Sequence, residues 1–575
     1  MSRLRPVLNR ERTGVGLVAL LFLTLPFELD QPLLQLGPVG ITNIEILLGL
    51  ILALAAYRLW QADAPFPTLP RYWKWAGMIF ILALVLSAVF APSYKVNALK
   101  ASFRTLSGLA LMLSLPLLLH NRRHIRVVIQ ALVAGAILAA LLGLFEVLTS
   151  SDLILLTPFR VRSSVIGPFL RLTGPFDYTN QAAMYLEVGT ILLVALLSWS
   201  IRHMSRWGYL WLFGLAVCLE ATIQTISRAA IGTLFLVFAG MTGITWLRSR
   251  DWKAALVWTA PIGLMLLLGL LAPLLSPAVI LRLTGEDDSA WYRADIEVQD
   301  SLTMLADTSV VIPITIHNQG VFTWDKDRAF PVNLGATWIL EDEGIELDYR
   351  PRWSFDEPVQ PERTVQKSIE LRAPQDSGEY TLVWDLVQEH VLWFSERQDT
   401  TAETSVTVLP NPELEPGVAR PGAIPTTRAT TKKQTYLPIP GRSLLWPLAL
   451  RLWQQHPLTG IGLDNFRLLY GPALDMSVWN ESVHSNNWYL ETLVSLGLVG
   501  AVPFFLWAGS FILALVRGLL RKPDMLLVGI TGGLFAFFVH GLLDYFLLFN
   551  STALCFWGLV GMWLTYYQLD EKATS

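Results

Sequence analysis

Twelve apolar runs dominate this chain, and most approach the roughly 20 residues that a helix needs to cross a bilayer. Only 15% of the 575 residues are charged, against about 25% in soluble proteins, so much of the surface faces lipid. The pattern predicts an all-α polytopic membrane protein with about 12 transmembrane helices. We place the first nine in 1–280 and the last three, with a short cytoplasmic tail, in 487–575. The runs lie near 13–29, 40–57, 74–92, 103–119, 125–148, 181–201, 208–225, 229–247, 253–280, 487–516, 524–548 and 551–568.

Lys and Arg in the loops predict the orientation, because cytoplasmic loops carry an excess of both. With the N-terminus inside, the inner segments hold 19 of these cations and the short outer loops hold 7. The first apolar run leads to Glu28 and Asp30 rather than to a small-residue cleavage site, so we expect it to be a span and not a cleaved signal peptide. Both termini are therefore predicted to be cytoplasmic, and the loop 281–486 extracytoplasmic. The seven outer cations run against the bias, which binding of an anionic headgroup would explain. They are Lys95, Lys100, Arg104, Arg160, Arg162, Arg171 and Arg228.

A polar insert follows the ninth run, and its first part alternates apolar and polar residues as strands do. About seven such strands over 290–409 predict an all-β sandwich. The pattern resembles bacterial immunoglobulin-like modules, at Asn318, Gly320, Trp324, Gly378, Tyr380 and Trp393. The two cysteines, Cys218 and Cys555, lie in apolar runs, so we expect packing rather than a disulfide to hold the sandwich.

Aromatic residues of the insert allow two interpretations. Trp324, Trp338, Trp353, Trp384 and Trp393 could stack on sugar rings, but the more ordinary role is in the sandwich core. The proline-rich stretch 410–440 then reads as an extended linker.

Residues 441–486 are predicted to form an outer catalytic loop that begins with an amphipathic helix. Its motifs are Arg-x-x-x-Trp, then Pro-x-x-Gly-x-Gly-x-x-x-Phe, then His-Ser-Asn-Asn before an aromatic run, with Gly-x-x-Gly behind. They fall on Arg442 and Trp446, on Pro457, Gly460, Gly462 and Phe466, on 484–491, and on Gly497 and Gly500.

In this order the motifs resemble the O-antigen ligase and polymerase superfamily of membrane glycosyltransferases. Upstream, 171–176 with Asn180 and the pair Ser227-Arg228 also look like the family, as does the late His540-Gly541-Leu542-Leu543-Asp544. One departure is clear: many members have His-x-His-Asn, and here Asn486 stands where the second histidine would be, leaving His484 as the histidine of the motif.

The resemblance implies transfer of a glycan from a polyprenyl-diphosphate carrier, such as undecaprenyl diphosphate, to a lipid, glycan or protein acceptor, as in lipopolysaccharide and other cell envelope polysaccharide biosynthesis. Guanidinium groups suit the leaving diphosphate because they donate bidentate, charge-assisted hydrogen bonds. We predict Arg228 and Arg442 as catalytic clamps and His484 as general base. The further residues predicted to bind substrate are Arg171, Asn180, Asn486, Asn487, Gly460, Gly462, His540 and Asp544.

More ordinary roles stand beside these. An arginine at a span end can simply snorkel to the interface, His540 and Asp544 could brace helices, and Gly460 and Gly462 most readily permit a tight turn. No cofactor is expected, and no acidic metal-binding constellation appears in the outer loops, so metal-independent transfer is predicted. A net charge of -3 gives no case for nucleic acid. The rival interpretations are a transporter or flippase of lipid-linked glycans and a catalytically inactive envelope scaffold.

Overall fold

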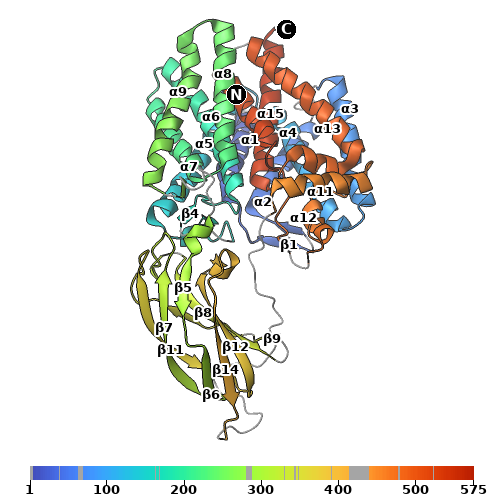
Figure 1. Cartoon of the computed structure of the whole chain (residues 1–575). Coiled ribbons are helices and arrows are strands. Elements are labelled where there is room, and N and C mark those ends of the chain that lie inside the picture. The colour runs from blue at the N-terminus through green and yellow to red at the C-terminus, as the bar shows by residue number, and fades with distance from the viewer. Residues whose placement is uncertain are drawn as a thin grey trace.

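The computed structural model describes the chain except for a few terminal residues and internal segments. The excepted positions are 1–3, 38, 62–68, 162–163, 167–168, 277, 280–287, 329, 342–344, 348, 390, 413–439, 477–478, 522–523 and 575. The predicted linker 410–440 lies almost wholly outside the described residues. The described part forms a helical bundle with a β-domain at one end (Figure 1).

Twelve long helices make the bundle in the described part of the chain, one at each apolar run. Eight of them are long and apolar enough to span a membrane, and two shorter apolar helices cover 12–27 and 525–540. The prediction of a helical membrane protein with an inserted β-domain is confirmed. The helices are α1 (Leu4–Thr24), α2 (Asn43–Trp60), α3 (Arg71–Phe90), α4 (Lys95–Leu118), α5 (Arg122–Thr149), α6 (Thr179–Arg202), α7 (Trp207–Gln224), α8 (Arg228–Ser249), α9 (Trp252–Leu271), α13 (Trp488–Arg521), α14 (Met525–His540) and α15 (Asn550–Thr574).

The helices α14 and α9 end well before the apolar runs that predicted them, and the early end of α14 shapes the site. The run at 524–548 predicts one span, but α14 ends at His540 and a loop follows before α15. Gly541 interrupts the helix, and the Asp544 N–H closes a turn by donating to the His540 carbonyl (3.1 Å). We call residues 541–549 the α14–α15 loop. Similarly, α9 ends at Leu271, where Pro273 leads into a short 3-10 turn instead of a continued span.

The β-domain consists of two sheets. The larger has the order β10-β8-β12-β14-β6, with β9 beside β8 and β13 beside β12, and the smaller has the order β11-β7-β5. All pairs are antiparallel except β14 with β6. The strands are β5 (Ala294–Glu297), β6 (Ser301–Leu305), β7 (Ser309–Asn318), β8 (Val332–Leu340), β9 (Ile345–Glu346), β10 (Arg352–Ser354), β11 (Thr364–Arg372), β12 (Gly378–Gln388), β13 (Leu392–Trp393) and β14 (Ala402–Leu409).

The tryptophans of the β-domain are mainly core residues. Trp324, Trp338 and Trp384 are fully buried and Trp393 is buried, whereas Trp353 is half-buried. The core interpretation therefore holds for four of the five, and these four rings are not available to stack on a sugar. The classification as an immunoglobulin-like module remains a prediction.

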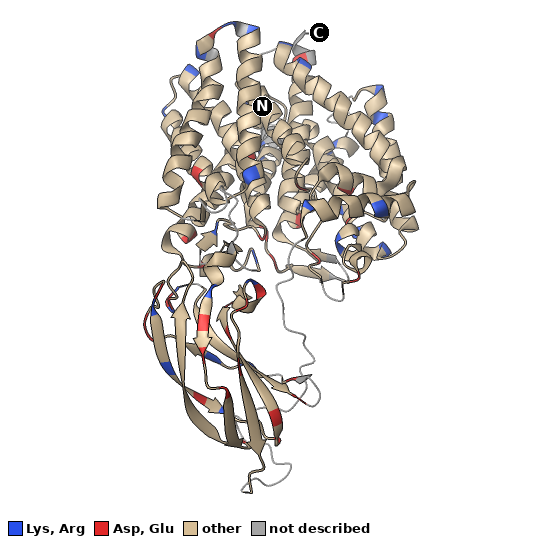
Figure 2. Cartoon of the chain, viewed as in Figure 1, with Lys and Arg blue, Asp and Glu red and all other residues tan. Residues whose placement is uncertain are grey.

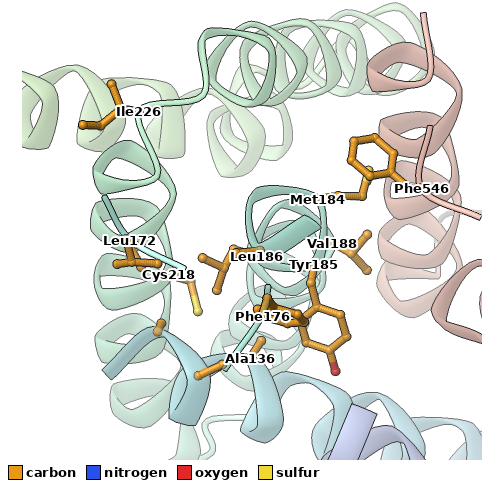
Figure 3. Packing of buried hydrophobic residues seen from close by; sticks show 14 of the residues in the cluster. Ala136, Leu172, Phe176, Met184, Tyr185, Leu186, Val188, Cys218, Ile226 and Phe546 are labelled. Atoms are coloured by element: carbon orange, nitrogen blue, oxygen red, sulfur yellow. The ribbon is translucent and has the colours of Figure 1, made fainter. Parts of the chain in front are cut away.

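The helix α6 lies at the centre of the bundle, because 83% of its apolar membrane-spanning stretch is buried inside the protein. Its residues point to several neighbours: Leu186 lies toward Cys218 of α7, and Met184 and Val188 lie toward Phe546 of the α14–α15 loop (Figure 3). The Tyr185 hydroxyl donates to the Phe22 carbonyl of α1 (3.1 Å). α6 therefore contacts elements from both ends of the sequence, and its N-terminal end lies where polar residues from distant segments meet.

Helix count places the β-domain relative to the termini. Nine long helices precede the β-domain and three follow it, so both termini lie at the end of the bundle away from it. Lys and Arg are visible at that far end and again near α11 and α12 at the β-domain end (Figure 2). The helices α11 (Arg442–Gln455) and α12 (Phe466–Leu469) lie at the β-domain end, near the short hairpin β1–β2 (Leu34–Leu36, Val39–Ile41) (Figure 1). A second short hairpin, β3–β4 (Ser164–Ile166, Phe169–Arg171), lies at the same end of the bundle, near α7.

A buried ion pair holds the segment between α5 and α6. Arg160 is 3% exposed and donates to both carboxylate oxygens of Glu146, one of them at 2.9 Å. It also donates to the Thr173 hydroxyl (2.8 Å) and the Gly174 carbonyl (2.6 Å). The pair therefore fixes the stretch that leads from Arg171 to the start of α6.

We expect Glu146→Gln to lower the free energy of unfolding by about 3 kcal/mol, because it leaves the buried Arg160 guanidinium partly uncompensated. Thermal unfolding in detergent measures this. The control is Lys367→Gln, which removes an ion pair to a 90% exposed Asp356 side chain and should change stability by less than about 1 kcal/mol. Equal effects of the two variants would contradict the structural role of the buried pair.

Candidate functional site

The α14–α15 loop is the point where residues from distant parts of the sequence meet. Arg442, the first residue of α11, donates from Nε (3.1 Å) and Nη2 (2.6 Å) to the Leu543 carbonyl. The Asn487 amide donates to the Leu542 carbonyl (2.9 Å), and the Trp488 N–H donates to the Gly541 carbonyl (2.7 Å). These bonds join the start of α11 and the start of α13 to three consecutive residues of the α14–α15 loop.

Asp544 connects this loop to the start of α6. Its Oδ2 accepts from the Asn180 amide (2.7 Å) and from the Tyr178 hydroxyl (3.4 Å). Burial and the Asp544 charge raise the pKa of Tyr178, while the positive charges of Arg171 and Arg442 oppose that rise. Both arginines therefore act electrostatically on one hydroxyl, although they are far apart in sequence.

His540 forms a second buried contact at the same place. Its Nδ1 lies 2.7 Å from Oε1 of Glu187 in α6, and both side chains are fully buried. Its ring packs edge-on to Phe546, with centroids 4.7 Å apart. The pair braces α6 against α14, and buried ionisable groups in a membrane bundle are also candidates for function.

His484 is oriented by a carboxylate that the sequence motifs did not assign. Its Nε2 lies 3.2 Å from Oδ1 of Asp464. Asp464 also accepts from Arg467, with Nε to Oδ1 at 2.8 Å and Nη2 to Oδ2 at 3.0 Å, and from the Asn97 amide at 3.2 Å. His484 and Asp464 are both buried, so the imidazole has a fixed direction.

The charges around the imidazole set its protonation. Burial by itself lowers the pKa of His484, but the hydrogen bond to Asp464 and the charges of Glu491 and Asp464 outweigh it and raise the pKa above the usual value. Burial raises the pKa of Asp464, yet its hydrogen bonds with His484 and Arg467 hold that pKa below the usual value. With Nε2 committed to the carboxylate, a neutral ring has Nδ1 as its proton acceptor, and no described hydrogen bond uses Nδ1.

The residues after His484 shape the start of α13. Ser485 donates from Oγ (2.6 Å) and from its backbone N–H (3.0 Å) to Oε2 of Glu491. Asn487 caps the helix by accepting from the Leu490 N–H (3.0 Å). Asn486 is half-buried in a left-handed backbone conformation (φ 51°), which asparagine tolerates. Asn487 thus has a structural role in addition to the predicted contact with substrate.

The glycines of the Gly-x-Gly and Gly-x-x-Gly motifs interlock two backbone segments. The stretch 457–462 runs beside a break in α13 at Gly497, with the Ile461 N–H donating to the Val494 carbonyl (2.9 Å) and the Leu498 N–H to the Pro457 carbonyl (2.8 Å). Gly460 (φ +70°) and Gly497 (φ +58°) each face the other's backbone segment, and a Cβ on either would lie 2.4 Å from carbonyl atoms. Gly460 is therefore required for the close packing of the two segments. The turn that contains it leads directly to Asp464, which contacts His484.

We therefore expect Gly460→Ala to destabilise the protein by at least about 2 kcal/mol, because it adds both a left-handed backbone penalty and a clash. The matched control is Gly509→Ala in α13, where a Cβ would meet no atom within 4 Å, and which should not destabilise. Thermal unfolding in detergent distinguishes the two. A Gly460→Ala protein as stable as the parent would show that this turn is not tightly packed.

Arg228 and Arg171 lie at a neighbouring part of the same end. Arg171 donates from Nε to the Thr225 carbonyl (2.7 Å) in the turn before α8. Arg228 is the exposed first residue of α8, after the N-cap Ser227. Within the described residues, no hydrogen bond or ion pair joins Arg228 to the α14–α15 loop. The structure thus brings six of the predicted residues together around that loop: Arg442, His484, Asn180, Asn487, His540 and Asp544. Arg171 and Arg228 lie instead at the turn between α7 and α8.

Sequence reasoning missed two carboxylates of this site, Asp464 and Glu491. Asp464 lies in the motif stretch 456–466 and Glu491 in 484–491, so their positions in the sequence could have identified them as candidate site residues. Their role as partners of His484 depends on the fold, because 20 residues separate Asp464 from the histidine.

Fold and site together define a multi-pass helical membrane protein whose polar residues converge at the β-domain end of the bundle. The family model described as O-Antigen ligase matches residues 391–505. This match confirms the resemblance to the O-antigen ligase superfamily and supports a membrane enzyme that transfers glycosyl groups. The matched range contains Arg442, Gly460, Gly462, Asp464 and His484. A search of curated proteins gave no match.

Proposed function

We propose that the protein transfers a glycan from a polyprenyl-diphosphate carrier to an acceptor hydroxyl at the outer face of the membrane. The observation that carries this proposal is the convergence of Arg442 and His484 on the α14–α15 loop, at the end of the bundle opposite both termini. The ring of His484 lies 5.7 Å, between centroids, from the ring of Tyr545, the residue that follows Asp544 in the α14–α15 loop. The predicted sidedness, with cytoplasmic termini, puts this end outside.

The reaction requires a base that accepts the proton of the acceptor hydroxyl and cationic groups that stabilise the leaving diphosphate. The acceptor hydroxyl oxygen attacks the anomeric carbon, the bond from that carbon to the diphosphate oxygen breaks, and the diphosphate lipid leaves with the electron pair. His484 takes the hydroxyl proton at Nδ1, and Asp464 stabilises the resulting imidazolium. The charge that develops on the diphosphate is met by Arg442, with Arg171 and Arg228 reaching it from the neighbouring turn.

Asp464 also supports His484 as the base in a chain that has Asn486 at the position of the second histidine of the motif. The family's usual histidine is replaced there, but His484 carries the features of a base: a carboxylate partner, a fixed ring direction and a free acceptor nitrogen. Asn486 is then a hydrogen-bonding neighbour of the substrate and not the base.

The direct test incubates the purified full chain, reconstituted in lipid, with a polyprenyl-diphosphate glycan and a series of lipid, glycan and protein acceptors. Appearance of glycosylated acceptor together with released polyprenyl diphosphate supports the proposal. Export of intact lipid-linked glycan without bond cleavage would instead indicate a transporter, and no reaction with any acceptor would indicate a scaffold. Arg228→Ala tests the proposed clamp at the start of α8, and a rate equal to that of the parent would remove it from the site.

A further inference from the structure

A cavity of about 240 Å³ lies between α3, α4, α13 and α15, and none of the residues placed in the proposed site lines it. Three residues of α15 at helical spacing, Trp557, Val560 and Leu564, form its buried wall. Met78 and Ile81 of α3 also line it and are exposed, so the cavity is open to the lipid-facing surface of the bundle. Voids in packed protein interiors rarely exceed the size of a water molecule, and this cavity therefore has room for a ligand.

One charged side chain stands at the end of this apolar cavity. Among the described residues that line it, only Lys74 carries a charge, and the others are aromatic, aliphatic or small. Lys74, Gly77, Met78 and Ile81 share one face of α3, so the lysine ends an apolar stripe. It lies in the first turn of α3, which begins at Arg71 at the end of the bundle that carries both termini. That end is predicted to be cytoplasmic.

Further cations gather at the same end of α3 and α13. The two helices are joined there by the Trp73 ring nitrogen, which donates to the Ser510 hydroxyl (3.0 Å). The cations are Arg71 at the start of α3 and, near the end of α13, Arg517 and Arg521. All three, like Lys74, are exposed, and within the described part of the chain none of the four has a carboxylate partner. This positive surface next to the cavity suits an anionic ligand.

The position of the cavity specifies which lipid fits. A lysine near the end of a span ordinarily extends to the interface, but Lys74 also lines the cavity. Pro503, another lining residue, lies 15 residues after Trp488 in α13, roughly 22 Å along the helix from the α14–α15 loop. A lipid with its headgroup at Lys74 thus has its polar end opposite the proposed site. Because basic residues at the cytoplasmic surface attract anionic lipids, we propose that the cavity binds one acyl chain of an anionic glycerophospholipid of the cytoplasmic leaflet, with the phosphate at Lys74.

A lipid bound in this way is a structural ligand of the bundle. Its acyl chain contacts α3, α4, α13 and α15 together, because it fills the space between them. Its phosphate offsets the mutual repulsion of the four cations. A ligand that binds only the folded chain stabilises that chain by mass action. This role goes beyond the proposed function and does not depend on it.

Photo-crosslinking measures this binding without turnover. The full chain is reconstituted in phosphatidylcholine nanodiscs that contain a small fraction of phosphatidylglycerol with a diazirine in one acyl chain, and adducts are mapped by mass spectrometry after irradiation. We expect adducts at 503–507, and Lys74→Gln should lower their yield about fivefold through the loss of one cation near the lipid phosphate. Gly77→Phe should lower the yield at least as much. Gly77 lines the cavity and a Cβ there meets no atom within 4 Å, so the ring occupies the cavity without a clash.

Matched controls separate the cavity from lipid that merely surrounds the bundle. Lys253→Gln removes an exposed lysine from the first turn of α9, at the same end of the bundle. Gly240→Phe adds the same ring to an exposed position of α8, where a Cβ also meets no atom within 4 Å. Both should keep the adduct yield of the parent at 503–507 within about twofold. In detergent, phosphatidylglycerol should raise the Tm of the parent more than phosphatidylcholine does, and Lys74→Gln should lose this difference.

Competition between unlabelled lipids decides the identity of the occupant. Phosphatidylglycerol should reduce the adducts at 503–507, and phosphatidylcholine at the same mole fraction should not. Equal competition by the two lipids, or an unchanged yield in both Lys74→Gln and Gly77→Phe, would overturn the proposal and leave only non-specific lipid contact. Displacement by undecaprenyl phosphate at a lower mole fraction than phosphatidylglycerol would also overturn it, because the cavity would then hold the chain of a carrier lipid. Glycan transfer is not measured here, so none of these results bears on the proposed function.

Discussion

His484→Gln should lower the rate of glycan transfer by about 10²–10⁴-fold, which is the usual contribution of a positioned general base. Glutamine can keep a hydrogen bond to Asp464 but cannot accept the hydroxyl proton at neutral pH. The loss should therefore fall on kcat, with KM for donor and acceptor changed little. Initial rates in reconstituted membranes, at saturating donor, measure the effect.

The pH dependence gives this prediction a second readout. Only neutral imidazole can take a proton, so the transfer rate should rise with pH through a midpoint that lies above the usual histidine value of about 6.5. Asp464→Asn removes a negative charge and a charged hydrogen-bond partner, and burial then lowers the pKa of His484. The midpoint should consequently move to lower pH, even though the maximal rate falls.

A carboxylate in the same loop, between α11 and α13, provides the control. Asp475→Asn makes the same chemical change at an exposed residue in a left-handed backbone conformation (φ 55°) that asparagine also tolerates. Its pH profile should coincide with that of the parent. A profile of Asp464→Asn that also coincides would show that His484 is not the group whose ionisation controls the rate.

Arg442→Ala should lower the rate about 10²–10³-fold, the typical cost of removing one donor from a site that stabilises developing charge. Arg442→Lys should recover only part of the rate, because an ammonium group keeps the charge but not the planar fork that meets two phosphate oxygens. The measurement is the single-turnover rate with a polyprenyl-diphosphate donor.

Because Arg442 also donates to the Leu543 carbonyl, a purely structural role must be separated from charge stabilisation. Thermal stability should change little in Arg442→Lys while the rate remains reduced, whereas a structural role would move both together. Arg451→Ala, an exposed arginine on the same helix, should retain the rate of the parent within about twofold. A single-turnover rate in Arg442→Ala equal to that of the parent would exclude Arg442 as a clamp.

Sequence patterns were informative where structure depends on neighbouring residues. The twelve apolar runs each became a helix, because a segment that must bury its backbone polar groups in lipid forms its hydrogen bonds internally. Strand alternation likewise placed the β-domain, since the side-chain period of two is a local property. The motif order placed Arg442 and His484 in the stretch that the family model also matches.

Only the tertiary structure decided how the site is assembled. The apolar run at 524–548 gave no sign that α14 ends at His540, yet the loop created there receives Arg442, Asn487 and Asn180. The pairing of Glu187 with His540 spans 353 residues, and hydrophobic periodicity carries no information about such a partner. Composition and spacing therefore determined which segments cross the membrane, while hydrogen bonds between distant segments determined which carboxylate orients the histidine and which side chains share one loop.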